Sequence, residues 1–155
     1  ASCENPGSSS VQAYDTGRMA GFASPGNTRT MRQPVSTRIA ALVGIAGASA
    51  VLLGAFGAHA LRGVLDARGA ELWHTAVNYH AWHALALAVA AGLGRGRSGR
   101  VAVAAFVVGI VLFSGSLYAL ALGAPRWVGI ITPFGGLAFV AGWLALGWAL
   151  RTRNE

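Results

Sequence analysis

The sequence predicts an all-α fold, an integral membrane four-helix bundle with both chain ends on the cytoplasmic side. Three observations lead to this prediction. Hydrophobic residues make up 54% of the 155 residues and charged residues only 11%, against roughly 25% charged residues in an average soluble domain. The apolar residues gather in four long stretches, and arginine flanks these stretches unevenly. So few charges cannot cover a water-facing surface, which argues against a soluble protein.

The first 37 residues differ in composition from the rest of the chain. Residues 1–37 are rich in Ser, Gly, Pro, Thr and Asn and show no apolar period. Such a segment buries too little apolar surface to offset the entropy lost on ordering. We therefore predict a disordered polar tail over 1–37, a membrane domain over 38–151 and a short cytoplasmic tail over 152–155. Cys3 is the only cysteine, so no internal disulfide or cysteine-based metal site is expected.

Four membrane-spanning helices are predicted, over residues 39–60, 76–93, 101–122 and 127–150. The first carries no formal charge and corresponds to about 33 Å of helix at 1.5 Å per residue, which matches a hydrocarbon core of about 30 Å. The second is shorter and contains Asn78, Tyr79, His80 and His83. Only helices and closed barrels satisfy their backbone groups in lipid, and these continuous apolar runs lack the alternation of barrel strands.

The loop between the first two predicted spans, residues 61–75, mixes apolar and charged residues. Two interpretations are open. The spacing of its apolar residues suits a short helix lying in the outer membrane interface. Alternatively, the segment is an ordinary polar connector that is broken at Gly69.

Arginine predicts the orientation of the chain. One side of the predicted spans carries Arg18, Arg29, Arg32, Arg38, Arg95, Arg97, Arg100, Arg151 and Arg153. The other side carries Arg62, Arg68 and Arg126. Because arginine-rich loops stay in the cytoplasm, we predict a multi-pass protein of the bacterial plasma membrane with both termini cytoplasmic.

The charge pattern also bears on partners. The net charge of +7 comes from arginines that flank apolar runs and do not form one basic patch, so no nucleic-acid partner is predicted. The lipid bilayer is the predicted partner, and a homo-oligomer or a membrane-protein partner is left open. The sequence Ala58-His59-Ala60 resembles a secretory cleavage site, but the apolar run before it exceeds the roughly 7–15 residues of a signal peptide.

Polar residues of all four predicted spans fall in the same half of the membrane, because consecutive helices alternate in direction. The candidate residues are His59, Tyr79, His80, His83, Ser114, Ser116, Tyr118 and Thr132. Polar groups in a membrane are costly and usually face the protein interior. We predict a polar cluster in the outer half that stabilises the helices through hydrogen bonds and offers a site for a small ligand or ion.

A metal or haem site is an alternative use of the histidines. His80 and His83 are three residues apart and therefore share one helix face, and with His59 they make a candidate three-imidazole metal site. A haem between His59 and His83 is the weaker version of this idea. No Asp, Glu or Cys lies within the spans to complete a ligand set, so we predict neither a metal nor another cofactor. No catalytic arrangement is recognisable, and no enzyme activity is predicted.

A helix break is predicted in the fourth span at Thr132-Pro133-Phe134-Gly135-Gly136. Pro133 removes a backbone donor, and Gly135 and Gly136 add backbone freedom. Transporters use such broken helices to bind ions or substrates, which makes a small transporter or channel subunit the alternative function. The structural interpretation is a packing kink.

Four motifs occur in a characteristic order. They are Gly54-Ala55-Phe56-Gly57-Ala58-His59, Tyr79 with His83-Ala84-Leu85-Ala86-Leu87, Phe113-Ser114-Gly115-Ser116-Leu117-Tyr118, and the Thr132–Gly136 segment with Ala141-Gly142-Trp143. Over about residues 39–150 the chain resembles the YgdD/YwdK-like family of small bacterial inner-membrane proteins, domain-of-unknown-function family four-two-three. The resemblance implies a four-span plasma-membrane protein with no established biochemical role and no catalytic residue. Family members often have Gln in place of His80, whereas His59 and His83 fit the pattern.

Overall fold

The computed structural model describes residues 35–94 and 96–151, and these residues are helical apart from short turns. The elements are α1 (Thr37–His59), α2 (Ala67–Leu93), α3 (Gly96–Gly109), the π-helical turn η2 (Ile110–Ser114), α4 (Gly115–Ala121), the 3₁₀ turn η3 (Arg126–Ile130) and α5 (Thr132–Arg151). Within these two ranges there is no strand, which confirms the all-α class. The predicted tails lie outside the described residues, except that α1 already begins at Thr37.

Within residues 35–94 and 96–151, three helices are long and apolar enough to cross a membrane. They are Thr37–His59, Gly96–Ala121 and Arg126–Arg151, and they overlap the first, third and fourth predicted spans. The second of them is continuous through α3, η2 and α4. α2 has 27 residues, or about 40 Å of helix. It is long enough to span, but its polar residues keep it out of this group by composition.

Residues 61–75 form neither a separate interfacial helix nor a connector broken at Gly69, because Gly69 lies inside α2. The chain turns over residues 60–66, and α2 begins at Ala67. The Asp66 carboxylate accepts a hydrogen bond from the backbone N–H of Gly69 at 2.6 Å, which is the usual way to satisfy a helix N-terminus. Trp73 is only 5% exposed and packs with Leu61 and Ala121. The early start of α2 thus gives the tryptophan a buried site in place of an interfacial one.

The irregular part of the fourth predicted span does not lie at Thr132–Gly136, where the sequence predicted it. The irregular part comes earlier, where η3 ends at Ile130 and α5 starts at Thr132. Pro133 therefore lies in the first turn of α5, where its missing N–H costs no helical hydrogen bond. Gly135 and Gly136 lie inside the regular helix. The transporter alternative was based on a helix break at Pro133, Gly135 and Gly136, and α5 is continuous through these residues.

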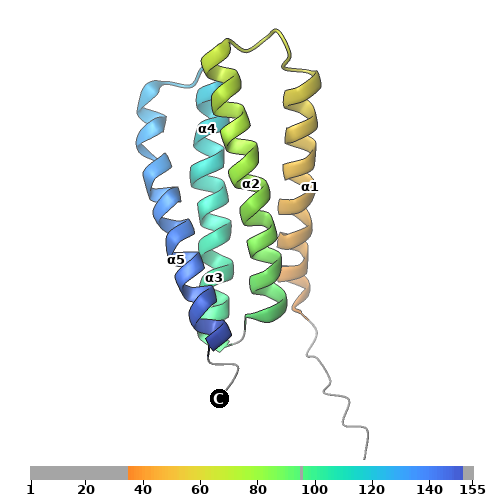
Figure 1. Cartoon of the computed structure of the whole chain (residues 1–155), viewed down its shortest axis with the longest axis vertical. Coiled ribbons are helices and arrows are strands. Elements are labelled where there is room, and N and C mark those ends of the chain that lie inside the picture. The colour runs from red at the N-terminus through yellow and green to blue at the C-terminus, as the bar shows by residue number, and fades with distance from the viewer. Residues whose placement is uncertain (1–34, 95, 152–155) are drawn as a thin grey trace, which may run out of the picture. The chain divides into compact units, whose positions relative to one another are not determined.

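The helices pack largely in chain order. α1 packs mainly against α2, and α2 packs against α3, η2 and α4. α5 packs mainly against α3 and η2, so α1 and α5 lie on opposite sides of the central helices (Figure 1). The turns over residues 60–66 and 122–125 lie at one end, which we call the Gly63 end. The end of α2, the start of α3 and the end of α5 lie at the other, the Gly94 end (Figure 1).

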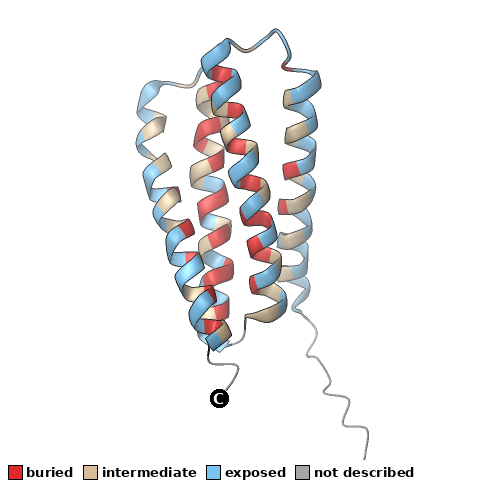
Figure 2. Ribbon diagram, in the orientation of Figure 1, coloured by how far each residue is buried: buried red, intermediate tan, exposed pale blue. Residues whose placement is uncertain are grey.

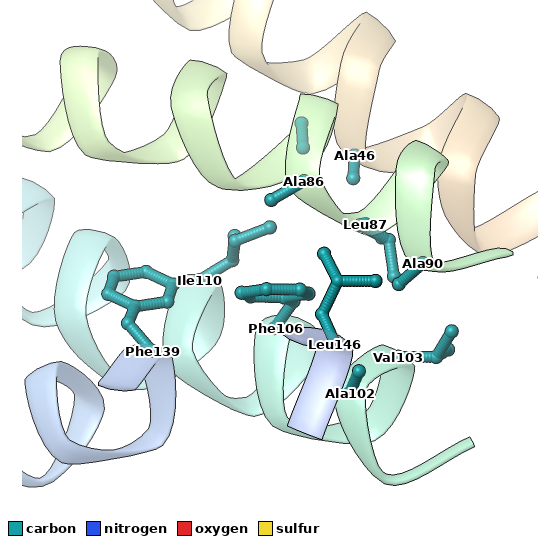
Figure 3. Packing of buried hydrophobic residues seen from close by; sticks show 11 residues of the cluster. Ala46, Ala86, Leu87, Ala90, Ala102, Val103, Phe106, Ile110, Phe139 and Leu146 are labelled. Atoms are coloured by element: carbon teal, nitrogen blue, oxygen red, sulfur yellow. The ribbon is translucent and has the colours of Figure 1, made fainter. Parts of the chain in front are cut away.

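The main core cluster takes residues from every long helix (Figure 3). Leu87 of α2 and Phe106 of α3 are fully buried, and Leu146 of α5 is 2% exposed. Two aromatic rings pack directly against glycines of the neighbouring helix. A Cβ atom at Gly142 would lie 2.7 Å from the Phe106 ring, and one at Gly109 would overlap the Phe139 ring. Close helix approach at glycine is typical of packing in membranes, where dense van der Waals contact drives association.

The outer surface of the helices is apolar. Only 6% of the most apolar stretch of α1 is buried, against 39% for the Gly96–Ala121 helix. Figure 2 shows the same contrast, with buried residues concentrated on the central helices and mostly exposed residues on α1. Val51 and Leu52 of α1 are 72% and 69% exposed, and Leu144 of α5 is 72% exposed. Large exposed apolar surfaces of this kind mark contact with a membrane or a partner.

Candidate functional site

The buried polar residues are concentrated where α2 meets its neighbours. His80 and His83 are 5% and 8% exposed, and Ser114 and Ser116 are 0% and 5% exposed. These four make up all the buried polar side chains in the described ranges 35–94 and 96–151. His80 lies at the middle of the 27-residue helix α2. The interior between the described helices thus contains hydrogen-bonding groups but no carboxylate and no arginine.

His80 links α2 to two other helices. Its Nε2 atom is 3.3 Å from Ser49 Oγ on α1, and its Nδ1 atom is 3.4 Å from the Tyr118 hydroxyl on α4. Side chains in a helix lean toward the helix N-terminus. Because α2 and α4 run in opposite directions, this lean brings the His80 and Tyr118 side chains toward each other.

The partners of His80 determine which ring nitrogen carries the proton. The Ser49 hydroxyl lies 2.7 Å from the backbone carbonyl of Ile45, and a carbonyl can only accept, so the hydroxyl donates to it. Ser49 Oγ must then accept from His80 Nε2–H. The unprotonated Nδ1 atom of neutral His80 in turn accepts from the Tyr118 hydroxyl. A directed chain results, from Tyr118 through His80 and Ser49 to the α1 backbone.

His83 has the opposite tautomer. Its Nδ1 atom is 2.7 Å from the Tyr79 carbonyl oxygen and therefore donates to it. The remaining Nε2 atom accepts from the indole N–H of Trp143 on α5, at 3.4 Å. The imidazole also stacks on Phe139, with ring centroids 3.4 Å apart and planes inclined by 13°. Both ring nitrogens of His83 are thus hydrogen-bonded: Nδ1 within α2 and Nε2 to α5.

Two serines near the Gly63 end differ in their surroundings. Ser116 Oγ is 2.7 Å from Thr132 Oγ1 and also donates to the Phe113 carbonyl at 2.9 Å. This pair joins α4 to the start of α5. Ser114 Oγ, in the π-helical turn, is fully buried and has no hydrogen-bond partner among the described residues. Buried hydroxyls without a partner are uncommon, because desolvation is then uncompensated.

Aromatic packing supports the cluster on the α1 side. The Trp73 and Tyr118 rings have centroids 4.7 Å apart. The Trp73 indole N–H donates to the Leu53 carbonyl of α1 at 3.1 Å. Gly57 makes this approach possible, since a Cβ atom there would overlap the indole ring. Trp73 thereby fixes the position of the Tyr118 ring, whose hydroxyl contacts His80.

The alternative three-histidine site does not form among the described residues. His59 is exposed at the end of α1, and among the described residues no three His, Cys, Asp or Glu side chains come close enough together to hold a metal ion. His80 and His83 were expected to share one face of α2. In the structure they reach different neighbours, since His80 contacts α1 and α4 whereas His83 contacts α5. Three residues in a helix differ by about 60° in direction, which is enough to reach different neighbours.

Of the other predicted site residues, Tyr79 is not buried, and two residues of the observed cluster were not predicted. Tyr79 is 44% exposed and serves through its backbone carbonyl, while its ring packs against Phe113 with centroids 4.5 Å apart. Sequence reasoning missed Ser49 and Trp143. A signal for Ser49 existed, since it is the single hydroxyl in the apolar run of α1. Trp143 belongs to the Ala141-Gly142-Trp143 motif, but nothing in the sequence pointed to its contact with His83, which lies 60 residues away.

A groove lies on the α1 side of the His80 chain. It has a volume of about 450 Å³ and runs between α1 and the continuous helix formed by α3, η2 and α4. Its walls are aliphatic, and its polar lining residues are Ser49, His80 and Tyr118. The volume lies in the range of roughly 300–1,000 Å³ that is typical of small-molecule sites.

Comparison with known proteins places the chain in a family. Residues 53–136 match the family described as "Protein of unknown function (DUF423)". No solved structure matches the chain.

Several bacterial proteins are similar over most of their length. The UPF0382 membrane protein YwdK of Bacillus subtilis is 48% identical over 101 residues, which cover 63% of this chain and 82% of YwdK. A UPF0382 membrane protein of Haemophilus influenzae is 41% identical over 69% of this chain and 88% of its own length. The UPF0382 inner membrane protein YgdD of Escherichia coli is 39% identical over 72% of this chain and 88% of YgdD. The chain therefore belongs to the DUF423 family.

Proposed function

We propose that this chain is a four-span protein of the bacterial plasma membrane with both termini in the cytoplasm. Its buried polar side chains hold α2 against the other helices and form a site for a small ligand or ion in the outer half. The observation that carries this proposal is that hydrogen-bonded polar groups lie between helices whose outward surfaces are apolar. The related proteins YwdK and YgdD are named membrane proteins, which supports the location.

The position of its polar groups supports α2 as a membrane span beside the three more apolar helices. His80 and His83 point inward and are hydrogen-bonded. The outward face of the same helix carries Trp82, Leu85 and Val89, which are 68%, 63% and 42% exposed. A helix with such a division presents apolar side chains to lipid although its average composition is moderately polar.

A stabilising role of the cluster is tested by removing one hydroxyl. Tyr118→Phe keeps the ring against Trp73 but takes away the donor to His80 Nδ1. Interhelical hydrogen bonds in membrane proteins contribute about 0.6 kcal/mol on average and about 1.7 kcal/mol at most. We expect the free energy of unfolding in detergent to fall by about that much, measured by thermal or denaturant unfolding of the full chain.

Tyr79→Phe is the matched control, because the Tyr79 hydroxyl makes no hydrogen bond to another described residue and its ring also packs on an aromatic neighbour. His83→Leu tests the second half of the cluster by removing the link from α2 to Trp143. Unchanged unfolding midpoints for both Tyr118→Phe and His83→Leu would contradict a cluster that holds the helices together.

A further inference from the structure

The groove beside His80 has the shape of a site for an elongated ligand. One wall follows a single face of α1 from Leu42 to Leu53, and the other follows a single face of the Gly96–Ala121 helix from Val107 to Tyr118. Each wall covers eleven residue steps, or about 16 Å along the helix axis at 1.5 Å per residue. This is about half of a hydrocarbon core of about 30 Å. A spanning helix of a second protein needs the full thickness, so the groove suits a shorter occupant.

The polar groups of the groove can turn toward a ligand. The Tyr118–His80 and His80–Ser49 contacts are 3.4 and 3.3 Å long. Both exceed the usual 2.7–3.2 Å of an N–H···O hydrogen bond. Tyr118 and Ser49 are each only half-buried and line the groove directly. The Tyr118 hydroxyl is therefore a weakly engaged donor, and an acceptor oxygen at normal hydrogen-bond distance can compete for it. The His80 ring also bonds to the Ala46 backbone, so a ligand oxygen competes there with a second partner.

The charge of the groove selects against ionic ligands. Among the described residues that line the groove, His80 is the only one that could carry a charge near neutral pH. Its hydrogen bonds assign one proton to the ring, which is the neutral form. A phosphate or carboxylate head would lose its hydration without gaining an opposite charge, which is strongly unfavourable in a low-dielectric site. Ser49 and His80 also lie near the middle of α1 and α2, far below the level of phospholipid headgroups. The fitting ligand is neutral, and its polar end lies within the hydrocarbon layer.

We propose that this groove binds an isoprenoid quinone, a neutral lipid-soluble molecule with carbonyl acceptors on a planar ring and a long apolar tail. A carbonyl oxygen accepts hydrogen bonds from the Tyr118 hydroxyl and His80 Nε2–H, and the tail lies along the aliphatic walls formed by residues such as Ile45, Val107 and Val111. The inference rests on the proposed function, since it names the class of ligand for that polar cluster. It concerns binding and includes no redox step.

The test uses the full chain in quinone-free detergent micelles with decylubiquinone as the probe. Side chains labelled with ¹⁵N-histidine report directly on the ring nitrogens. We expect a saturable shift of the His80 resonances, no shift at His83, and a rise in the unfolding temperature with added probe. Loss of one hydrogen bond, in Tyr118→Phe or His80→Leu, should weaken binding by about tenfold.

Three controls separate the outcomes. His80→Gln keeps a donor and an acceptor and should retain most of the affinity, whereas Trp143→Phe removes an indole donor on the far side of α2 and should leave the affinity unchanged. Phenyldecane has the tail without carbonyls and should not shift His80. Equal effects of phenyldecane and decylubiquinone would mean a groove for lipid chains only and would overturn the proposal. So would a groove covered by a second copy, seen as cross-linking between Ile45→Cys variants, or the absence of saturable binding. None of these results changes the effect of Tyr118→Phe on stability. The stabilising role of the cluster is therefore tested by unfolding, and the quinone site is tested by binding.

Discussion

At the scale of single residues, the two buried histidines show how surroundings decide the role of a side chain. His80 donates from Nε2 and accepts at Nδ1, whereas His83 donates from Nδ1 and accepts at Nε2. In each case a backbone carbonyl, which can only accept, fixes the donor and acceptor roles of all the hydrogen bonds connected to it. Both rings are satisfied in the neutral form, and this fits a site enclosed by apolar helices, where a buried charge without a partner is costly.

Ser114 and Ser116 give a matched pair of serines for a prediction. Ser114 Oγ is buried without a partner among the described residues, while Ser116 Oγ bonds to Thr132 Oγ1. An unsatisfied buried hydroxyl costs roughly 1–3 kcal/mol. We expect Ser114→Ala to raise the free energy of unfolding by about 1 kcal/mol and Ser116→Ala to lower it by about 0.6–1.7 kcal/mol, as measured by unfolding in detergent. A destabilising Ser114→Ala would mean that this hydroxyl binds a water molecule or a ligand.

At the scale of the elements, the π-helical turn η2 and α5 approach each other closely at Gly135. η2 covers Ile110–Ser114, and the N–H of Gly115 bonds back to the carbonyl of Ile110 in the wide π pattern. Gly135 of α5 lies directly against the backbone of Phe113, so that a Cβ atom there would overlap the Phe113 nitrogen. Single π turns inside α-helices are frequent at functional sites. Here the turn contains Ser114 and ends two residues before Ser116.

Gly135 and Gly136 provide the corresponding test. The nearest atoms to a Cβ at Gly136 are 3.9 Å away, on the Phe113 ring. We expect Gly135→Ala to destabilise the protein by about 1–3 kcal/mol through overpacking. Gly136→Ala should be neutral or stabilising by up to about 1 kcal/mol, because alanine is the better helix former. Unfolding midpoints of the two variants check this. Equal effects would contradict the close contact between η2 and α5.

At the scale of the whole molecule, the helices form a core that is small relative to their apolar surface. α1 and α5 each contact the central helices on one side and expose large apolar residues on the other. The described arginines divide between the two ends: Arg62, Arg68 and Arg126 belong to the Gly63 end, and Arg38, Arg97, Arg100 and Arg151 to the Gly94 end. The sequence adds Arg18, Arg29 and Arg32 before α1 and Arg153 after α5, so most of the arginines belong to segments that adjoin the Gly94 end in the sequence.

This distribution predicts the orientation in the membrane. We expect the Gly63 end to face outward and the Gly94 end to face the cytoplasm, because arginine-rich segments are retained there. In a Cys3→Ser background, Ala60→Cys should react with a membrane-impermeant thiol reagent added to intact cells. Ser36→Cys and Ser98→Cys should react only after the membrane is opened. Labelling of Ser98→Cys in intact cells would reverse the orientation, and equal labelling of Ala60→Cys and Ser36→Cys would contradict a spanning α1.

Which parts of this structure were predictable depends on whether the signal is local. The start of α1 and the long apolar helices could be inferred because run length and composition act within one segment. The early start of α2 could not, because its apolar positions look interfacial until Trp73 meets Leu61 and Ala121. Pro133 was likewise ambiguous, since a proline breaks a helix in its interior but is well placed in its first turn. The position of the preceding turn decides between the two cases.

The sequence by itself determined the helical class and the apolar character of the helices, because both follow from the side chains of each segment alone. It also singled out His80, His83, Ser114 and Ser116, which are buried, since polar groups are rare in such runs. Only the tertiary structure decided their partners. His80 reaches Ser49 and Tyr118 across 31 and 38 residues, and Trp143 reaches His83 across 60. Such contacts depend on which helix faces meet and at what height, and these are properties of the packed helices that no single segment encodes.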